Sequence, residues 1–203
     1  MDFPISQPGE YTSQEFKKVV LRAGRINRVE FHACAFIKCT LCETIFETCR
    51  FIDCTFKGCD LSLANLKGST FQNTRFTDSQ IIGVDWTQTT WTNHKALLVR
   101  PVDFQACALN HSTFMGLSMR HMQLEKCVAH DVSFEESDLT RANCTFTDFT
   151  GSRFQRTNLT EADFTSATNY TISPQLNTLK KTKFSLPEAM ALLYGLDIIL
   201  TES

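Results

Sequence analysis

Nine cysteines are the residues of this 203-residue chain with the widest range of chemistry, from zinc binding to disulfide exchange. A zinc site needs several thiolates that converge, and paired Cys-X-X-Cys spacings are its usual sign. One such spacing exists, at Cys39 and Cys42, but no second pair accompanies it. The other cysteines of this cluster are separated by five residues or a multiple of five, which is a structural period. We therefore predict buried, reduced thiols and no metal site.

Five histidines are scattered along the chain, and none stands beside a serine or cysteine in a recognisable nucleophile motif. The chain also lacks a glycine-rich loop that would hold a phosphate group. An enzymatic function therefore has no residue to carry it. We predict a protein that is not an enzyme and that needs no cofactor.

The elements that hold these side chains follow a five-residue period. From Phe16 to Trp91 every fifth residue is large and apolar, and after a change of frame the series resumes from Phe104 to Phe164 with two smaller members. Five matches neither the period of a helix nor that of a flat strand, so the chain must turn once in each unit. The phenylalanines of the series form the predicted core stack: Phe31, Phe36, Phe46, Phe51, Phe56, Phe71, Phe76, Phe104, Phe114, Phe134, Phe149, Phe154 and Phe164.

The residue two positions before each large one is small or β-branched in most units. We expect both to point inward, and four units to close a square coil of about twenty residues, with coils about 4.8 Å apart. Cys34 should then stack on Cys54, and Cys39 on Cys59. Free cysteine behaves as a small buried hydrophobe, which suits this position. The predicted inward ladder contains Cys34, Cys39, Cys49, Cys54 and Cys59.

The clearest units identify a family resemblance. Ala64-Asn65-Leu66, Thr157-Asn158-Leu159 and Ala162-Asp163-Phe164 resemble the consensus of the pentapeptide-repeat family. The resemblance covers about three quarters of the chain, and the unit recurs nearly thirty times. It implies an all-β solenoid, a right-handed quadrilateral parallel β-helix, with a small C-terminal helical cap. Such a solenoid gains its stability from the stacking of neighbouring coils.

The repeat divides the chain into segments. We expect an N-terminal lead-in or cap at 1–15, a first block of coils at 16–91, an interrupting loop at 92–103, a second block at 104–167 and a capping and dimerisation module at 168–203. Trp91 and Phe104 are thirteen positions apart, so either three or eight extra residues leave the coil. The loop is either a simple bulge or a partner contact. Its candidate contact residues are His94, Lys95, Leu97 and Arg100.

The C-terminal segment has its own pattern. Ser185 and Glu188 form a capping box that predicts a helix from Ala189 to Tyr194. Its apolar residues serve either as a lid over the last coil or as an interface, and they exceed what a lid needs, which favours a symmetric homodimer. The candidate dimer residues are Leu186, Met190, Leu193, Leu196, Ile198 and Leu200.

Charge and targeting signals limit the partners. A formal net charge of −2 argues against a broadly basic nucleic-acid binder. The first ten residues have no secretory signal pattern, and no stretch approaches the roughly 18 apolar residues of a membrane span. We predict a cytoplasmic protein with no membrane contact. Acidic side chains concentrate in residues 131–163, either as a solvated polar surface or as a partner-binding face: Asp131, Glu135, Glu136, Asp138, Asp148, Glu161 and Asp163.

The layout of rod, interrupting loop and C-terminal module resembles the quinolone-resistance and gyrase-protection branch of the family. The run Lys183–Ala189 is similar to the end of such proteins. This resemblance implies binding to DNA gyrase or topoisomerase IV by imitation of duplex DNA, with protection against quinolones or a topoisomerase toxin. Because the net charge is only −2, such mimicry requires a local acidic face around residues 131–163. The alternative is a generic rigid scaffold for protein interaction with no topoisomerase target.

Overall fold

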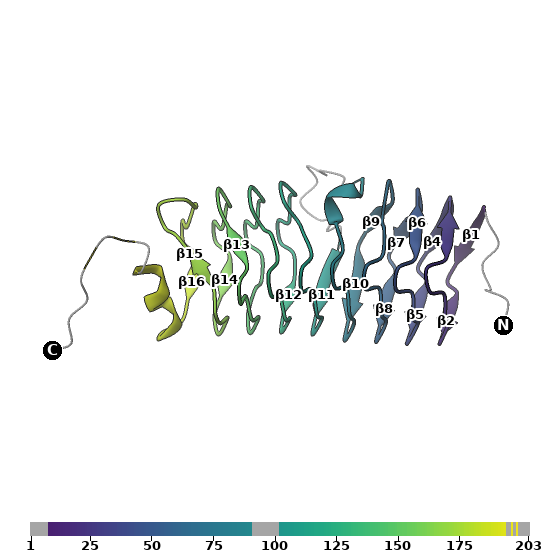
Figure 1. Cartoon of the computed structure of the whole chain (residues 1–203), viewed down its shortest axis with the longest axis horizontal. Coiled ribbons are helices and arrows are strands. Elements are labelled where there is room, and N and C mark those ends of the chain that lie inside the picture. Colours follow the sequence, from purple (N-terminus) through teal and green to yellow (C-terminus); the bar gives the residue numbers. More distant parts are fainter. Residues whose placement is uncertain (1–7, 91–101, 194–195, 197, 199–203) are drawn as a thin grey trace.

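The protein is described by a computed structural model that covers residues 8–90, 102–193, 196 and 198. Short parallel strands stack in successive coils and build an elongated all-β solenoid of about eight turns (Figure 1). The first strands lie at one end of the rod, and β15 and β16 lie near the other. The right-handed quadrilateral parallel β-helix predicted from the repeat is confirmed.

Each coil contributes to four faces, which we number from the column of core residues that begins at Phe16. Face 1 contains β2 (Glu15–Lys17), β5 (Ala35–Ile37), β8 (Thr55–Lys57), β10 (Thr74–Thr77), β11 (Val102–Gln105), β12 (Leu124–Glu125), β14 (Asp163–Phe164) and β16 (Lys183–Phe184). Face 2 is a column of isolated parallel bridges from Val20 to Thr168. Face 3 contains β3 (Arg25–Asn27), β6 (Ile45–Glu47), the 3-10 helix η1 (Trp86–Gln88), β13 (Arg153–Phe154) and β15 (Thr171–Ile172). Face 4 contains β1 (Gly9–Thr12), β4 (Val29–His32), β7 (Arg50–Ile52) and β9 (Thr70–Gln72), and continues as bridges from Ser118 to Thr178.

The register between coils is twenty residues, as the five-residue unit requires. Phe16 is aligned with Phe36, and Phe36 with Phe56. The register is 28 between Phe76 and Phe104, so this coil contains eight extra residues rather than three. The excess lies between Thr90, whose N–H donates to Ser69, and Val102, which pairs with Thr74. The predicted loop residues His94, Lys95, Leu97 and Arg100 lie outside the described residues.

The core is a set of aromatic columns along the axis of the rod. On face 1 the ring centroids of Phe16, Phe36 and Phe56 follow one another at 4.9 and 4.4 Å, with nearly parallel planes. Rings of adjacent columns meet edge to face, as Phe31 and Phe36 do at 5.3 Å. Both arrangements suit the ring quadrupole and each contributes roughly 0.5–1.5 kcal/mol beyond area burial. The selection of phenylalanine in the sequence follows from this stacking.

The corners depend on a left-handed backbone conformation two residues after most core residues. Lys18, Lys38, Lys126 and Arg141 have φ between 52° and 57°. In most five-residue units of the second block this residue sits inside a hydrogen-bonded turn, as where Ala142 N–H donates to Leu139 O at 2.9 Å. In most five-residue units of the first block the turn lacks that bond and the core residue belongs to a short strand.

The solenoid continues beyond the boundary expected at Ala167. Thr178 bridges to Asn158, and Phe184 is aligned with Phe164, so residues 177–180 are part of a coil. The repeat is hard to see there because β15 pairs with β13 at a register of eighteen residues before the twenty-residue register returns. The predicted C-terminal helix is present as a six-residue 3-10 helix, η2 (Glu188–Leu193). Tyr194, its expected end, lies outside the described residues.

Candidate functional site

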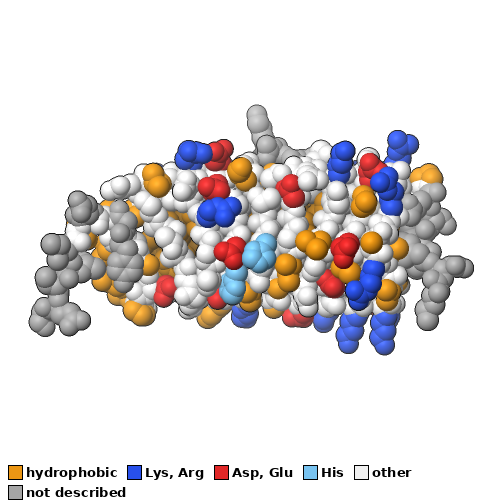
Figure 2. Space-filling view, viewed as in Figure 1, with side chains coloured by type: hydrophobic (Ala, Val, Ile, Leu, Met, Phe, Trp, Pro, Cys, Tyr) orange, Lys and Arg blue, Asp and Glu red, His pale blue; other side chains and the backbone are white. Residues whose placement is uncertain are grey.

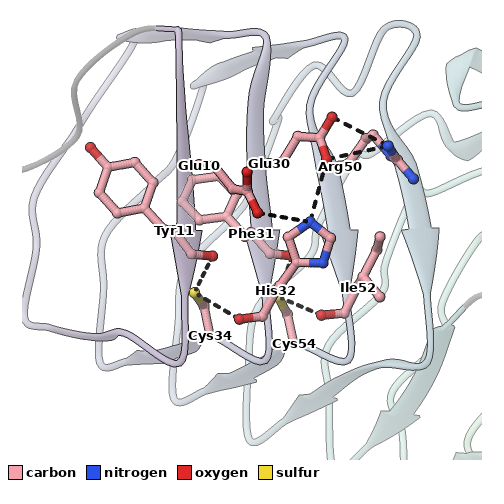
Figure 3. A network of polar contacts seen from close by, with 9 residues as sticks. All are labelled: Glu10, Tyr11, Glu30, Phe31, His32, Cys34, Arg50, Ile52 and Cys54. Carbon is pink, nitrogen blue, oxygen red and sulfur yellow. Dashed lines mark hydrogen bonds and ion pairs between the residues drawn. The ribbon is translucent and has the colours of Figure 1, made fainter.

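The small inward residues are hydrogen-bond donors as well as packing elements. Cys34 Sγ donates to the Tyr11 carbonyl at 3.3 Å and Cys54 Sγ to the Phe31 carbonyl at 3.3 Å, in each case 23 residues earlier (Figure 3). Ser and Thr do the same, as where Thr147 Oγ1 donates to Leu124 O at 2.6 Å. The carbonyl that each one satisfies belongs to an inward residue of the preceding coil. At Cys, Ser and Thr the position therefore combines a small side chain with a proton to donate, whereas Ala and Val at the same position, such as Ala142 and Val132, contribute packing alone.

The predicted thiol stack is present, and burial limits its reactivity. The Cys39 N–H donates to Cys59 Sγ at 3.4 Å, and both side chains are buried. Their shared side-chain hydrogen bond lowers the pKa of Cys39 to about 7 and raises that of Cys59. Burial raises the pKa of Cys54 to about 12 and that of Cys107 to about 11. Thiols that are this inaccessible cannot reach a substrate.

Cys42, the outward member of the single Cys-X-X-Cys spacing, does not complete a metal site. The side chain is covered by Arg22, whose guanidinium donates to Cys42 Sγ at 3.6 Å. Within the described residues there is no group of three His, Cys, Asp or Glu side chains that could hold a metal ion. In the same part of the chain, no helix is long and apolar enough to cross a membrane.

The seven predicted acidic residues do not form one acidic face. The coil places Asp163 on face 1 and Asp148 on face 2, because they bridge to Asn143 and Val128 respectively. Glu135 follows Ser133 on face 3, and Asp138 bridges to Ser118 on face 4. The stretch 131–163 is longer than one coil, so its side chains must point in all four directions. On the side of the molecule that Figure 2 shows, Asp and Glu are scattered among Lys, Arg and His.

Every one of these acidic residues also has a basic neighbour. Two of the ion pairs join Arg141 to Glu161 at 2.7 Å and Lys183 to Asp163 at 3.0 Å. Two partners are histidines, which carry a charge only when protonated. The remaining pairs are Arg153–Glu135 at 3.2 Å, Arg120–Asp138 at 3.3 Å, Arg156–Glu136, His130–Asp148 at 2.9 Å and His111–Asp131 at 3.7 Å.

The electrostatics of these carboxylates reflect their partners. The Ser133 hydroxyl and Arg153 lower the pKa of Glu135, and Arg141 lowers the pKa of Glu161. Partial burial opposes ionisation of Asp148, but hydrogen bonds from Asn169, His130 and Thr150 outweigh it and leave its pKa well below the usual range. These carboxylates are held ionised by local contacts, and the arginines beside Glu135 and Glu161 offset their negative charge.

The C-terminal end presents exposed apolar side chains, as the sequence predicted. Leu186 is 78% exposed, Ile198 is 51% exposed and Met190 is 40% exposed. Leu193 and Leu196 are half-buried, and Leu200 lies outside the described residues. The helix η2 lies beside β15 at this end of the rod (Figure 1). The candidate dimer residues therefore do not all serve to cover the last coil.

One exposed aromatic residue was not among the residues predicted from the sequence. Phe146 occupies a left-handed corner of face 1 with φ of 58° and is 57% exposed. The ammonium of Lys126 lies 5.9 Å from its ring centroid. A bulky residue is unusual in this backbone region, and exposed aromatic side chains are common anchors at interfaces. The repeat frame itself places Phe146 outward, two residues after Cys144, and this was the available signal.

Comparison with known proteins agrees with this architecture. The family model described as pentapeptide repeat region matches residues 29–100 and 95–164. The structure is similar to a trypsin-treated variant of QnrB1, a plasmid-mediated fluoroquinolone resistance protein, with a TM-score of 0.70, 15% identity, and coverage of 97% of this chain and 100% of that one. The full-length QnrB1 structure matches with a TM-score of 0.55 and 18% identity, over 93% of this chain and 100% of that chain.

A search of curated proteins finds no sequence match. The family model nevertheless spans most of both blocks, and it matches the same five-residue units that build the columns and corners described above. The chain is therefore a member of the pentapeptide-repeat family.

Proposed function

We propose that this protein is not an enzyme and acts by binding a protein partner with its outer surface, and that the partner is a type II topoisomerase, either DNA gyrase or topoisomerase IV. The observation that carries the proposal is the full-length similarity to a fluoroquinolone resistance protein, which extends over the C-terminal end as well as the coils. The interior supports a surface function, because it is filled by stacked rings and hydrogen-bonded small residues. Protection against quinolones or a topoisomerase toxin is the activity that follows.

The mode of binding that the surface favours is contact by shape and apolar anchors. Anionic imitation of DNA would need a continuous acidic stripe, and the seven acidic residues are instead distributed over four faces and paired with basic groups. The exposed side chain of Phe146 offers a better anchor, since it projects from a corner of face 1. The paired charges are also consistent with a second candidate function, a generic rigid scaffold with another protein target.

The experiment that tests topoisomerase binding is DNA supercoiling by purified gyrase in the presence of a fluoroquinolone. Added protein should restore supercoiling in a dose-dependent way. Phe146→Asp should reduce the rescue, while Leu63→Asp, a change at another exposed corner residue, should preserve it. An absence of rescue over a wide concentration range, with a folded protein, would reject topoisomerase and leave the scaffold function.

The C-terminal end supports a homodimer as part of this proposal. Leu186 is largely exposed in one chain and lies just before η2, so a second copy would bury it. Leu186→Arg should therefore give monomers in light scattering, and Leu63→Arg, which places the same charge at a distant corner, should leave dimers. A wild-type chain that is monomeric at micromolar concentration would refute the dimer without affecting the topoisomerase test.

A further inference from the structure

The first block carries a row of cations along face 1. Lys18 and Lys38 occupy successive left-handed corners beside β2 and β5, and Lys57 ends β8. Arg75 lies on the next strand, β10. All four side chains are exposed. We call this group the cationic ridge, and its four coils span about 14 Å at the spacing of paired strands.

The charges of the ridge are not compensated within the described part of the chain. No ion pair or hydrogen bond involves the side chains of its four members there, whereas the adjacent Lys17 is paired with Glu15 at 2.9 Å. On face 4, by contrast, Arg50 is paired with Glu30 at 3.2 Å (Figure 3). Lys and Arg project from the lower edge of the molecule below β2, β5 and β8 (Figure 2).

Two acidic residues lie at the far end of the ridge. Asp78 occupies the next corner of face 1, and Asp103 is aligned with Arg75 on the neighbouring strand β11. The Asp103 side chain is buried and accepts a hydrogen bond from the Gln123 N–H at 2.9 Å. The three lysines lie on earlier coils than both carboxylates, so most of the ridge keeps its positive charge.

Lys38 reaches beyond its own coil. At the corner after Lys38 the residue is Gly58, and a Cβ added there would lie 3.5 Å from Lys38 Cγ. The stem of Lys38 therefore extends across the corner of the next coil. Four like charges within a short distance raise the local positive potential, and an anionic group bound across them would lower it.

We infer that the cationic ridge is a docking surface for an acidic segment of the protein partner, a run of Asp and Glu that lies along the first four coils. This deepens the proposed function by giving the chemistry of the partner, and it rests on that function only in requiring a protein partner. An extended acidic segment would present alternate carboxylates on one side, about 6.8 Å apart, over the whole length of the ridge.

Nucleic acid fits the ridge less well than an acidic peptide does. Four cations are fewer than the roughly 6–10 phosphate contacts that give strong salt-dependent DNA binding. The chain as a whole has a formal net charge of −2, which disfavours a long polyanion. Base stacking would need an exposed ring beside the ridge, and Phe146 lies three coils beyond it, on the second block. A short acidic segment meets the ridge without these penalties.

The test uses the full chain and a fluorescein-labelled peptide of about twelve residues that alternates Glu and Ser, long enough to span the ridge. Fluorescence anisotropy at about 20 mM salt should show saturable binding that weakens as salt is added. The variant Lys38→Glu/Lys57→Glu should weaken binding roughly tenfold or more, because two attractions become repulsions. The peptide with Gln in place of Glu should not bind.

A matched control distinguishes the ridge from general charge. Arg28→Glu/Lys67→Glu makes the same change in net charge at the equivalent positions of face 3. Arg28 occupies a left-handed corner, as Lys38 does, and Lys67 stands one residue before a corner glycine, as Lys57 does. Glu47 lies on the coil between the two cations. This control should alter peptide affinity less than about twofold at this salt concentration. Equal losses in the two variants, or no saturable binding, would overturn the inference. So would tighter binding of a DNA duplex of equal length than of the peptide. Because gyrase is absent from the assay, its outcome is independent of the supercoiling test.

Discussion

The first block of coils (residues 8–90) and the second (residues 102–184) build the same cross-section by different local means. In the first, core residues lie in strands of three or four residues, such as β5 and β7. In the second, most strands shrink to two residues or to isolated bridges, and hydrogen-bonded turns such as Ser112 N–H to Leu109 O replace them. The inward columns continue through both blocks, so the stacking is the same whether strands or hydrogen-bonded turns form the sides of the coil.

The residue before the core position accounts for much of this difference. In the second block Asn143, Asn158 and Asp163 each accept a hydrogen bond from the backbone N–H two residues later, at 2.9–3.1 Å. This local bond favours a tight turn. In the first block the same position is often held by residues such as Ala35 and Thr55, whose side chains form no such bond. An Asn or Asp at this position accompanies the turns at Leu139 and Leu159, whereas the turn at Leu109 follows Ala108, so this residue favours the turn without being required for it. The large and small inward residues select the coil.

The largest expected effect breaks the columns of the first block. Phe51 is 1% exposed and stacks between Phe31 and Phe71 at 5.0 and 4.9 Å. Phe51→Asp removes roughly 3–5 kcal/mol of ring packing and buries an unpaired charge, a combined loss comparable to the whole stability of many domains. Circular dichroism should show loss of the cooperative thermal transition. Phe146→Asp, at an exposed ring, should melt near the wild type, and a normal melt for Phe51→Asp would contradict the column model.

The next effect compares inward donors in the two blocks. Thr147 Oγ1 donates to Leu124 O and accepts from the Cys127 N–H at 3.1 Å, so Thr147→Val leaves two buried groups unpaired and should cost about 2–4 kcal/mol. Cys54→Ala removes a weaker thiol donor and should cost about 1–2 kcal/mol. Urea denaturation gives both values. A larger loss for Cys54→Ala would show that packing, rather than hydrogen bonding, governs the position.

A smaller effect tests the turn-forming residue. Asn143 Oδ1 accepts from the Thr145 N–H at 3.1 Å, and its Nδ2 donates to Gln123 at 2.9 Å. Asn143→Ala should lower the free energy of unfolding by about 1 kcal/mol, similar to the loss of a helix cap. Thr55→Ala is the matched change in the first block and should cost less than about 0.5 kcal/mol. Equal losses of stability in the two variants would show that the hydrogen bonds of the Asn143 side chain do not stabilise the coil.

The smallest effect concerns pH. The lowered pKa of Asp148 means that its ionised form stabilises the fold above the unfolded pKa of about 4, and that this stabilisation is lost as pH falls through and below that value. Asp148→Asn should therefore reduce the difference in urea midpoint between about pH 7 and pH 3. Asp78→Asn, at an exposed carboxylate without a hydrogen bond in the described chain, serves as the control. An unchanged pH dependence in Asp148→Asn would show that its partners do not favour the ionised form.

The fold could be predicted from the sequence because the residues that repeat every five positions contact only their neighbours in the stack. Phe16, Phe36 and Phe56 are aligned as their spacing requires. The size of the insertion could not be read, because three and eight extra residues give the same five-residue frame, and only the pairing of Phe76 with Phe104 decides between them. The last coil was missed because β15 is out of register by two residues.

The candidate surfaces were predicted less well, for a geometric reason. Acidic residues that are close in sequence, such as Asp138 and Asp148, lie on different faces because each unit turns a corner. Residues twenty apart are the true neighbours, as Arg141 and Glu161 show. The cationic ridge could not be recognised from the sequence for the same reason, since it contains one residue from each of the first four coils. The exposed Leu186 and Met190 were predicted because no periodic neighbour covers the end of the stack.

The most direct test of the account is equilibrium binding of the full chain to purified gyrase holoenzyme, measured by biolayer interferometry. The account predicts saturable binding with a Kd of about 1 μM or tighter, equivalent to roughly 8 kcal/mol. Phe146→Asp should weaken it and Leu63→Asp should not. No saturation up to about 100 μM with a folded protein, or equal weakening by both variants, would contradict the account.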